Sequence, residues 1–157
     1  MRTMNISGTA FRTLWPLASG AVRVIDQSRL PFEFETRDLT SLEEAAHAIR
    51  TMIVRGAPLI GATAAYGLAL ALRADASDER IAEAAQVLRA TRPTAVNLAW
   101  ALERVRRSLA PLPVAQRAAA AFAEAGRICE VTSSSVGPSA CTVRSSFASA
   151  RSTSSVA

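Results

Sequence analysis

Apolar positions along the chain change their spacing near residue 40, and this change separates two kinds of predicted structure. Upstream of it, short runs alternate between apolar and polar residues, which is typical of strands with one buried face. Proline and turn-forming residues separate these runs. The expected extended segments are Phe11–Trp15, Ala21–Ile25 and Phe32–Thr36. The sequence therefore predicts a small β element at the N-terminus.

Downstream of residue 40, apolar residues recur at helical spacing. Ser41 and Glu44 form a capping box at the start of the first predicted helix, and Ser77 and Thr94 are expected to cap the third and the fourth. The second helix is apolar on most faces, which indicates a central position. The predicted fold class is α+β and mostly α, a small β element followed by a bundle of about five helices. These helices are expected over residues 42–54, 58–73, 78–90, 95–108 and 114–130.

The composition is that of an ordinary globular domain. Of the 157 residues, 50% are hydrophobic and 20% are charged, and this length favours one domain. No apolar run is long enough to cross a membrane. Residues 1–10 lack the apolar core of a signal peptide, so we expect a cytoplasmic protein. Two cysteines exclude a disulfide scaffold and a four-cysteine zinc site.

Charge and histidine content argue against two further classes of partner, nucleic acids and metal ions. All 18 basic residues are arginine, and the formal net charge is +5. A basic balance can indicate a nucleic-acid partner, but these arginines are scattered and form no run, so we expect no nucleic-acid binding. The single histidine, His47, cannot form a site with several histidine ligands, and we expect no bound metal. We interpret His47 as structural, because no serine or cysteine nucleophile lies within a helical turn of it.

The composition changes abruptly after Glu130. Residues 131–157 contain ten serines and no acidic residue, whereas residues 1–130 contain six serines and all 13 acidic residues. A segment of this kind buries little surface, so we expect a helical domain over 1–130 and a disordered tail over 131–157. Back-translation of Val131–Ser135 with one base restored can encode Gly-Asp-Ile-Val-Ile. The tail is therefore interpreted as out of frame.

Two breaks between helices carry arginine next to a helix start. Arg55, Gly56 and Ala57 precede Pro58, which suits a first helical turn. Free amide groups, the helix dipole and a neighbouring arginine can bind an anion there. The alternative is a plain turn with Arg55 in solvent. Arg92 stands at a second break of the same type, so two arginines could converge on one phosphate.

The alternative for Arg92 is a surface ion pair with Glu79 or Glu83, which would contribute little. Other polar or reactive residues have simpler interpretations. Asn97, early in the fourth helix, can bond the backbone locally. Cys129 ends an apolar helix face and is interpreted as a small buried hydrophobic residue. Cys141 lies in the serine-rich tail without a fixed basic partner, so neither cysteine is interpreted as an activated nucleophile.

Three motifs in order resemble one protein family. They are Val24–Pro31 (VIDQSRLP), Arg55–Gly61 (RGAPLIG) and Thr91–Leu98 (TRPTAVNL). Together they closely resemble the N-terminal part of the methylthioribose-1-phosphate isomerases, over about residues 11–130. Relatives of that family include the regulatory subunits of translation initiation factor 2B and ribose-1,5-bisphosphate isomerase. The TRPTAVNL string favours the isomerases over the initiation-factor relatives.

The resemblance implies an enzyme of L-methionine salvage. Such an enzyme converts 5-methylthioribose 1-phosphate to 5-methylthioribulose 1-phosphate, an aldose–ketose isomerisation that needs no cofactor. Arg55, Gly56, Ala57 and Arg92 would contact this sugar-phosphate substrate. The family is cytoplasmic and usually homodimeric, and its helical N-terminal domain precedes a larger Rossmann-like α/β domain.

This chain departs from the family where the chemistry should occur. In the family, a catalytic cysteine and a catalytic aspartate come from the Rossmann-like second domain, beyond the point where this chain leaves the family pattern, and we expect that domain to be absent. Cys141 does not stand in the family's Thr-x-Cys-Asn setting and is not assigned to that role. Because the acid–base groups for the sugar carbonyl are missing, we expect the chain to be inactive. The alternatives are a non-catalytic binding or regulatory module of the initiation-factor 2B type, and a non-functional fragment.

Overall fold

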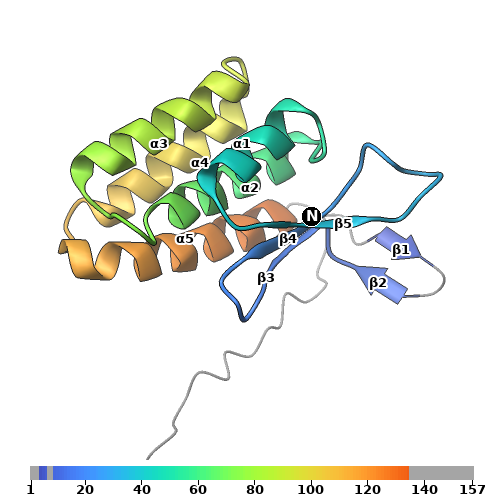
Figure 1. The fold of residues 1–157 in the computed structure, drawn as a ribbon, viewed down its shortest axis with the longest axis horizontal. Helices are drawn as coiled ribbons and strands as arrows, with labels where there is room; N and C mark the ends of the chain where they lie inside the picture. Colours follow the sequence, from blue (N-terminus) through green and yellow to red (C-terminus); the bar gives the residue numbers. More distant parts are fainter. Residues whose placement is uncertain (1–3, 7–8, 135–157) are drawn as a thin grey trace, which may run out of the picture.

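The computed structural model describes residues 4–6 and 9–134, in which a helical bundle stands beside a small sheet (Figure 1). Helix α2 is the centre of the bundle and packs against the four others. Every residue from Leu59 to Ala71 of α2 is buried, which confirms the central position predicted from its composition. The helices are α1 Leu42–Arg50, α2 Ala57–Ala71, α3 Asp78–Thr91, α4 Val96–Leu109 and α5 Val114–Ser134.

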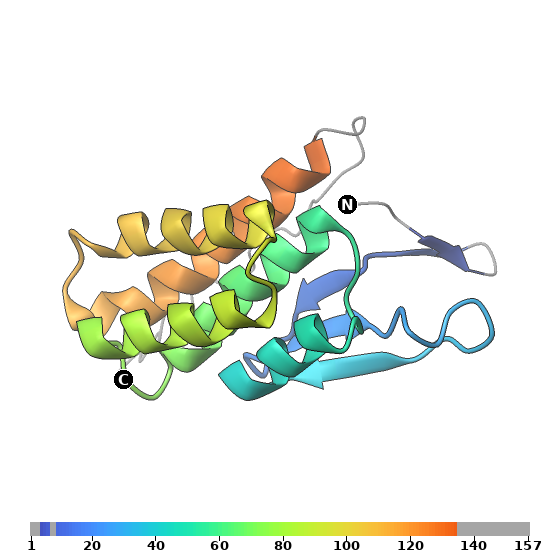
Figure 2. The same cartoon turned by 90° about the horizontal axis from the view of Figure 1, so that it is seen from above.

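The sheet is antiparallel, with β4 between β3 and β5. Leu14, Val22, Val24 and Leu39 point their side chains into the same hydrophobic core as the helices. The sheet lies at one end of the bundle, beside α1 (Figure 2). Its strands are β3 Leu14–Pro16, β4 Val22–Ile25 and β5 Thr36–Leu39, and a separate hairpin is formed by β1 Met4–Ile6 and β2 Thr9–Phe11. The predicted fold class, a small β element followed by five helices, is confirmed.

The strand boundaries differ from the prediction. The expected first strand, Phe11–Trp15, is divided between the end of β2 and the start of β3. The third strand lies at Thr36–Leu39 and not at Phe32–Thr36. The alternation over residues 32–35 misled the prediction, because the side chain of Phe32 is 92% exposed and that of Phe34 is 39% exposed. Pairing with β4 determines β5, including the ion pair between Arg23 and Asp38.

Several helix boundaries differ from the prediction; α2, for example, ends at Ala71 and not at residue 73. Helix α1 ends at Arg50 and not at residue 54, because Met52 takes a left-handed conformation (φ 62°). Thr94 is not the cap of α4, since Ala95 occupies that position. Helix α5 continues to Ser134, past the predicted boundary at residue 130, because residues 131–134 contain neither glycine nor proline. The remainder of the predicted tail, residues 135–157 with Cys141, lies outside the described residues.

Candidate functional site

Helix α2 begins on a glycine. Gly56 precedes the helix with φ 89°, a left-handed value that favours glycine. Its carbonyl accepts the first intrahelical bond, from the Ile60 amide at 3.0 Å. No side chain caps this start, and Gly56 and Ala57 are exposed. Because Pro58 has no N–H, Ala57 and Leu59 provide the first-turn amide donors at the positive end of the helix dipole.

Arg55, the neighbour of that glycine, is held by its backbone. The Arg55 amide donates to Oε1 of Gln27 at 2.8 Å. The guanidinium folds back on its own loop, where Nε donates to the Met52 carbonyl at 3.2 Å. The Arg55 side chain remains exposed. This end of α2 thus presents a cation and free amide donors on one short loop.

Helix α4 begins in a similar way. Arg92 follows the end of α3 and is half-buried, and its carbonyl accepts from the Ala95 amide at 3.0 Å. No side chain caps α4 at Ala95. Of the two carboxylates considered as partners for Arg92, that of Glu83 pairs with Arg80 at 2.8 Å.

The structure brings these two helix starts together. A Cβ atom at Gly61 would lie 2.9 Å from the backbone oxygen of Asn97, so the second turn of α2 packs closely against the first turn of α4. Both helices begin at the same end of the bundle (Figure 2). The four residues predicted to bind substrate, Arg55, Gly56, Ala57 and Arg92, therefore belong to two adjacent connections at that end. Asn97 contributes its backbone to this contact.

Strand β4 is followed by a turn that contacts the Arg55 loop, and hydrogen bonds to Asp26 hold this turn in place. The side chain of Asp26 is 1% exposed and accepts from the Ser28 amide at 3.0 Å, from the Ser28 hydroxyl and from Nε of Arg37 at 2.8 Å. Burial raises the pKa of the Asp26 carboxyl, but the bonds from Ser28 and Arg37 outweigh it and hold the pKa below its ordinary value. Asp26 is therefore ionised at neutral pH, and the turn it shapes carries Gln27.

The sequence predicted a turn at residues 26–28 and gave Asp26 and Gln27 no part in the site. The only signal was their position in the VIDQSRLP motif, since neither spacing nor periodicity links residue 27 to residue 55. Arg117 was also missed: this buried arginine donates to the Ala76 carbonyl at 3.1 Å and pairs with Asp78 at 2.9 Å. It anchors α5 to the start of α3 and is distant in sequence from every predicted site residue.

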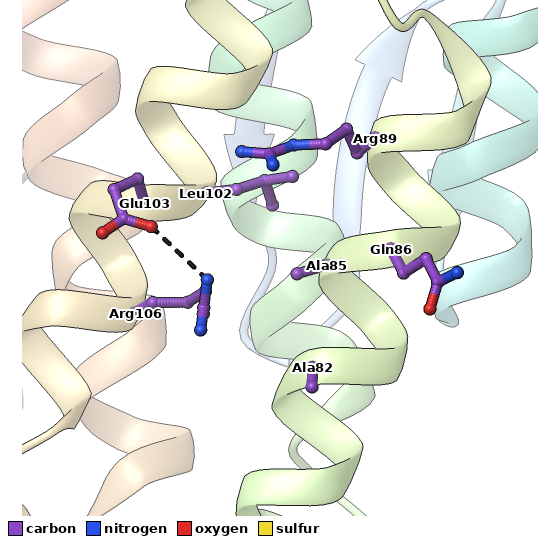
Figure 3. A pocket seen from close by; sticks show the side chains of 7 residues that line it. All are labelled: Ala82, Ala85, Gln86, Arg89, Leu102, Glu103 and Arg106. Atoms are coloured by element: carbon purple, nitrogen blue, oxygen red, sulfur yellow. Dashed lines mark hydrogen bonds and ion pairs between the residues drawn. The ribbon is translucent and has the colours of Figure 1, made fainter.

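One pocket lies away from these two helix starts. It has a volume of about 190 Å³ and opens between α3 and α4, where Glu103 and Arg106 pair at 3.4 Å (Figure 3). None of the four predicted site residues lines it. Its lining residues are Ala82, Ala85, Gln86, Arg89, Leu102, Glu103 and Arg106. We interpret it as a seam between two loosely packed helices.

The described residues contain neither a candidate metal-binding group nor a candidate membrane-spanning helix. Within residues 4–6 and 9–134, no group of three or more histidine, cysteine, aspartate or glutamate side chains is arranged to hold a metal ion. In the same part of the chain, no helix is long and apolar enough to cross a membrane.

Comparison with known proteins gives consistent matches. The Initiation factor 2 subunit family matches residues 53–135. The methylthioribose-1-phosphate isomerase of Methylobacterium nodulans is 65% identical over 128 residues, which are 81% of this chain and 35% of that protein. This chain therefore spans about a third of the length of such relatives.

Two solved structures resemble the fold equally well. The translation initiation factor eIF-2B subunit delta from A. fulgidus matches with a TM-score of 0.70 and 35% identity, over 76% of this chain and 37% of that one. The 5-methylthioribose 1-phosphate isomerase from Pyrococcus horikoshii matches with a TM-score of 0.70 and 36% identity, over 76% of this chain and 36% of that one. The backbone therefore does not separate the two kinds of relative.

Proposed function

Because the chain belongs to the Initiation factor 2 subunit family, we propose that it is the N-terminal part of a 5-methylthioribose-1-phosphate isomerase and binds the phosphate of that sugar. One observation carries the proposal: two helices without a side-chain cap begin side by side, with Arg55 two residues before α2 and Arg92 four residues before α4. The high identity to isomerases supports the choice of substrate. Arg55, Gly56, Ala57 and Arg92 would make the contacts.

A phosphate fits this arrangement for physical reasons. Each helix start contributes partial positive charge, which stabilises an anion by about 0.3–1 kcal/mol at an exposed site. Hydrogen bonds from arginine to phosphate are charge-assisted and contribute about 1.5–3 kcal/mol each. Neither α2 nor α4 carries an acidic residue in its first turn, so no carboxylate there repels the ligand.

The isomerisation needs more than this binding site. Moving a proton between the two carbons of an aldose and a ketose requires an acid and a base beside the sugar carbonyl. In the proposal these are the cysteine and aspartate of the second domain, in the two thirds of the relatives that this chain does not span. We therefore expect binding of the sugar phosphate without turnover.

Titration calorimetry tests the binding step. We expect 5-methylthioribose 1-phosphate to bind the purified chain, and Arg55→Ala and Arg92→Ala each to weaken binding about tenfold or more. Arg107→Ala is the matched control, because Arg107 is 79% exposed near the other end of α4 and pairs with Glu103. Equal affinity for all four proteins would contradict the proposed site. Turnover by the purified chain would contradict the assignment of the chemistry to the second domain.

A second candidate is a non-catalytic module of the initiation-factor 2B type. The equal similarity to the eIF-2B subunit favours it. Competition separates the two proposals. If a nucleoside monophosphate binds more tightly than 5-methylthioribose 1-phosphate, the regulatory module is favoured; the reverse order favours the isomerase. A sample that aggregates and shows no cooperative unfolding would instead support a non-functional fragment.

The origin of the serine-rich segment is a separate proposal. We propose that residues after about 130 are read out of frame, supported by the loss of all acidic residues at that point. Sequencing the coding DNA across Cys129–Val131 and about 700 bases beyond tests it. A missing base with an open frame behind it would support the proposal, and a confirmed frame would overturn it. The isomerase proposal also includes a cytoplasmic location and a homodimer. Sedimentation would detect the homodimer.

A further inference from the structure

We propose that Gln27 is a positioning residue for the anion site, which holds the Arg55–Gly56 loop in the conformation that presents its amides. This inference rests on the proposed function. Gln27 belongs to the VIDQSRLP motif, yet the site described above leaves it without a role. It follows β4 in sequence, and the loop it contacts lies 28 residues later in the chain.

Gln27 bonds this loop at two points. Its side-chain Oε1 accepts from the Arg55 amide at 2.8 Å, and its own amide donates to the Ile53 carbonyl at 2.9 Å. The second bond uses only backbone atoms, so any residue except proline could make it. The first requires an acceptor at the end of a side chain of glutamine length. The identity of residue 27 therefore matters through the Arg55 amide.

The position of the Arg55 amide affects how helix α2 begins. This amide belongs to the residue before Gly56, whose left-handed backbone sets the direction in which α2 begins. Met52, three residues before Arg55, is also left-handed, so this short connection contains two unusual conformations that other contacts must maintain. With the Arg55 amide fixed, the following peptide groups have fewer orientations open to them, and less entropy is lost when an anion binds.

Gln27 is itself held in place. The buried Asp26 carboxylate bonds the Ser28 amide and hydroxyl, one residue beyond Gln27. The Asp26 amide donates to the Glu35 carbonyl at 2.9 Å, which ties the turn to the approach of β5. Gln27 thus projects from a turn fixed on both sides. Hydrogen bonds through Gln27 therefore link the sheet to the loop before α2 without using the hydrophobic core of the helices.

Three variants of Gln27 separate the effects of the hydrogen-bond acceptor, the side-chain length and a negative charge at this position. Gln27→Leu removes the acceptor, and Gln27→Asn keeps the amide but shortens the side chain by one methylene. Gln27→Glu keeps both acceptor and length but places a negative charge beside the proposed anion. The matched control is Gln86→Leu, because Gln86 is an exposed glutamine on α3 at the edge of the pocket shown in Figure 3.

Two measurements on the full 157-residue chain test the inference. Amide hydrogen exchange of Arg55 reports whether its hydrogen bond to Gln27 is intact. Phosphate binding is followed by titration with inorganic phosphate, through the shifts of the amide resonances of Gly56, Ala57 and Leu59. For Gln27→Leu and Gln27→Asn we expect exchange about tenfold faster and phosphate affinity about fivefold weaker. For Gln27→Glu we expect exchange like that of the parent chain and affinity about threefold weaker, with the deficit shrinking as salt is added. Gln86→Leu should change neither.

The outcomes distinguish this inference from the proposed function. If phosphate does not shift these amides in the parent chain, the proposed anion site is wrong, whereas Arg55 exchange still tests the hold by Gln27. Unchanged exchange in Gln27→Leu and Gln27→Asn overturns the inference. So does parent-like phosphate affinity in Gln27→Leu, or in Gln27→Glu at low salt. If Gln27→Leu fails to fold, Gln27→Asn and Gln27→Glu decide.

Discussion

Helices α1 and α3 begin differently from helices α2 and α4. Ser41 accepts the amide of Glu44 at the start of α1, and Ser77 accepts the amide of Arg80 at the start of α3, each at 3.2 Å. Both starts carry two acidic residues in the first turn. Helices α2 and α4 have neither a side-chain cap nor an acidic residue in the first turn, and an arginine precedes them by two residues (Arg55) and four residues (Arg92).

This difference suggests a division of roles. A serine cap and first-turn carboxylates satisfy amide donors and the helix dipole from within the chain, which stabilises the fold. A start without them leaves the same donors for an external anion, at a cost in stability. Gly61 and Asn97 bring α2 and α4 close together near these uncapped starts, and this proximity makes them a candidate site.

The largest expected effect comes from separating the uncapped starts. Gly61→Ala would place a methyl group 2.9 Å from the Asn97 carbonyl oxygen, closer than real contacts allow. We expect the free energy of unfolding to fall by about 2 kcal/mol, because α4 must shift away from α2. Phosphate affinity should fall as well, since the two starts would no longer be adjacent. Urea denaturation and phosphate titration measure both effects.

The matched control for that change has the opposite sign. Gly126 lies inside α5, and a Cβ atom there would meet only the Tyr66 hydroxyl oxygen at 3.7 Å, an ordinary contact. Gly126→Ala should therefore raise the free energy of unfolding by about 0.5–1 kcal/mol through better helix propensity. Equal effects of the two substitutions would contradict the close approach of α2 and α4.

Removing a cap is expected to have the next largest effect. Ser77→Ala deletes the acceptor of the Arg80 amide and should lower the free energy of unfolding by about 1 kcal/mol. Because Ser77 caps the start of α3 and Arg92 follows its other end, phosphate affinity should stay unchanged. Thermal unfolding followed by calorimetry, together with the phosphate titration, checks this pair of outcomes. A loss of phosphate affinity would show that the capped starts also serve the site.

The same contrast explains which features the sequence could predict. Ser41 and Ser77 were recognised as caps because they act on amides three residues away, and the five helices were recognised from local periodicity. The cap at Thr94 was predicted wrongly, since the turn after Arg92 places Ala95 before the helix. Phe32 and Phe34 alternate with acidic residues as in a strand, but no neighbouring strand pairs with them within the described chain.

The candidate site divides in the same way. Arg55 and Arg92 could be proposed because each stands at a short break between two predicted helices that contains a proline. The contact between Gly61 and Asn97 and the bond from Gln27 join residues that are 36 and 28 positions apart. No periodicity reports such distances, so only the packed structure reveals them.

Adding a cap should reverse the effect of removing one. Ala95 has extended backbone angles (φ −78°, ψ 98°) that suit a capping residue, so Ala95→Asp should raise the free energy of unfolding by about 0.5 kcal/mol. The new carboxylate would occupy the amides of α4 and repel an anion, and phosphate affinity should fall severalfold. Urea denaturation and titration calorimetry on one preparation would test both. Stabilisation without loss of affinity would mean that α4 takes no part in the site.

The smallest effect is a difference in acid sensitivity between the two kinds of helix start. The Thr40 amide and hydroxyl donate to the Glu44 carboxylate and hold its pKa below the ordinary value of 4.5. A carboxyl with a lowered pKa contributes stability above its ordinary pKa and loses it as the pH falls through the lowered value. Helix α2 has no first-turn carboxylate to lose. Hydrogen exchange at Glu44 and Ala45 should therefore accelerate below about pH 4.5, relative to Ile60 and Gly61, and Glu44→Gln should abolish this difference. Equal acid sensitivity at both starts would break the comparison.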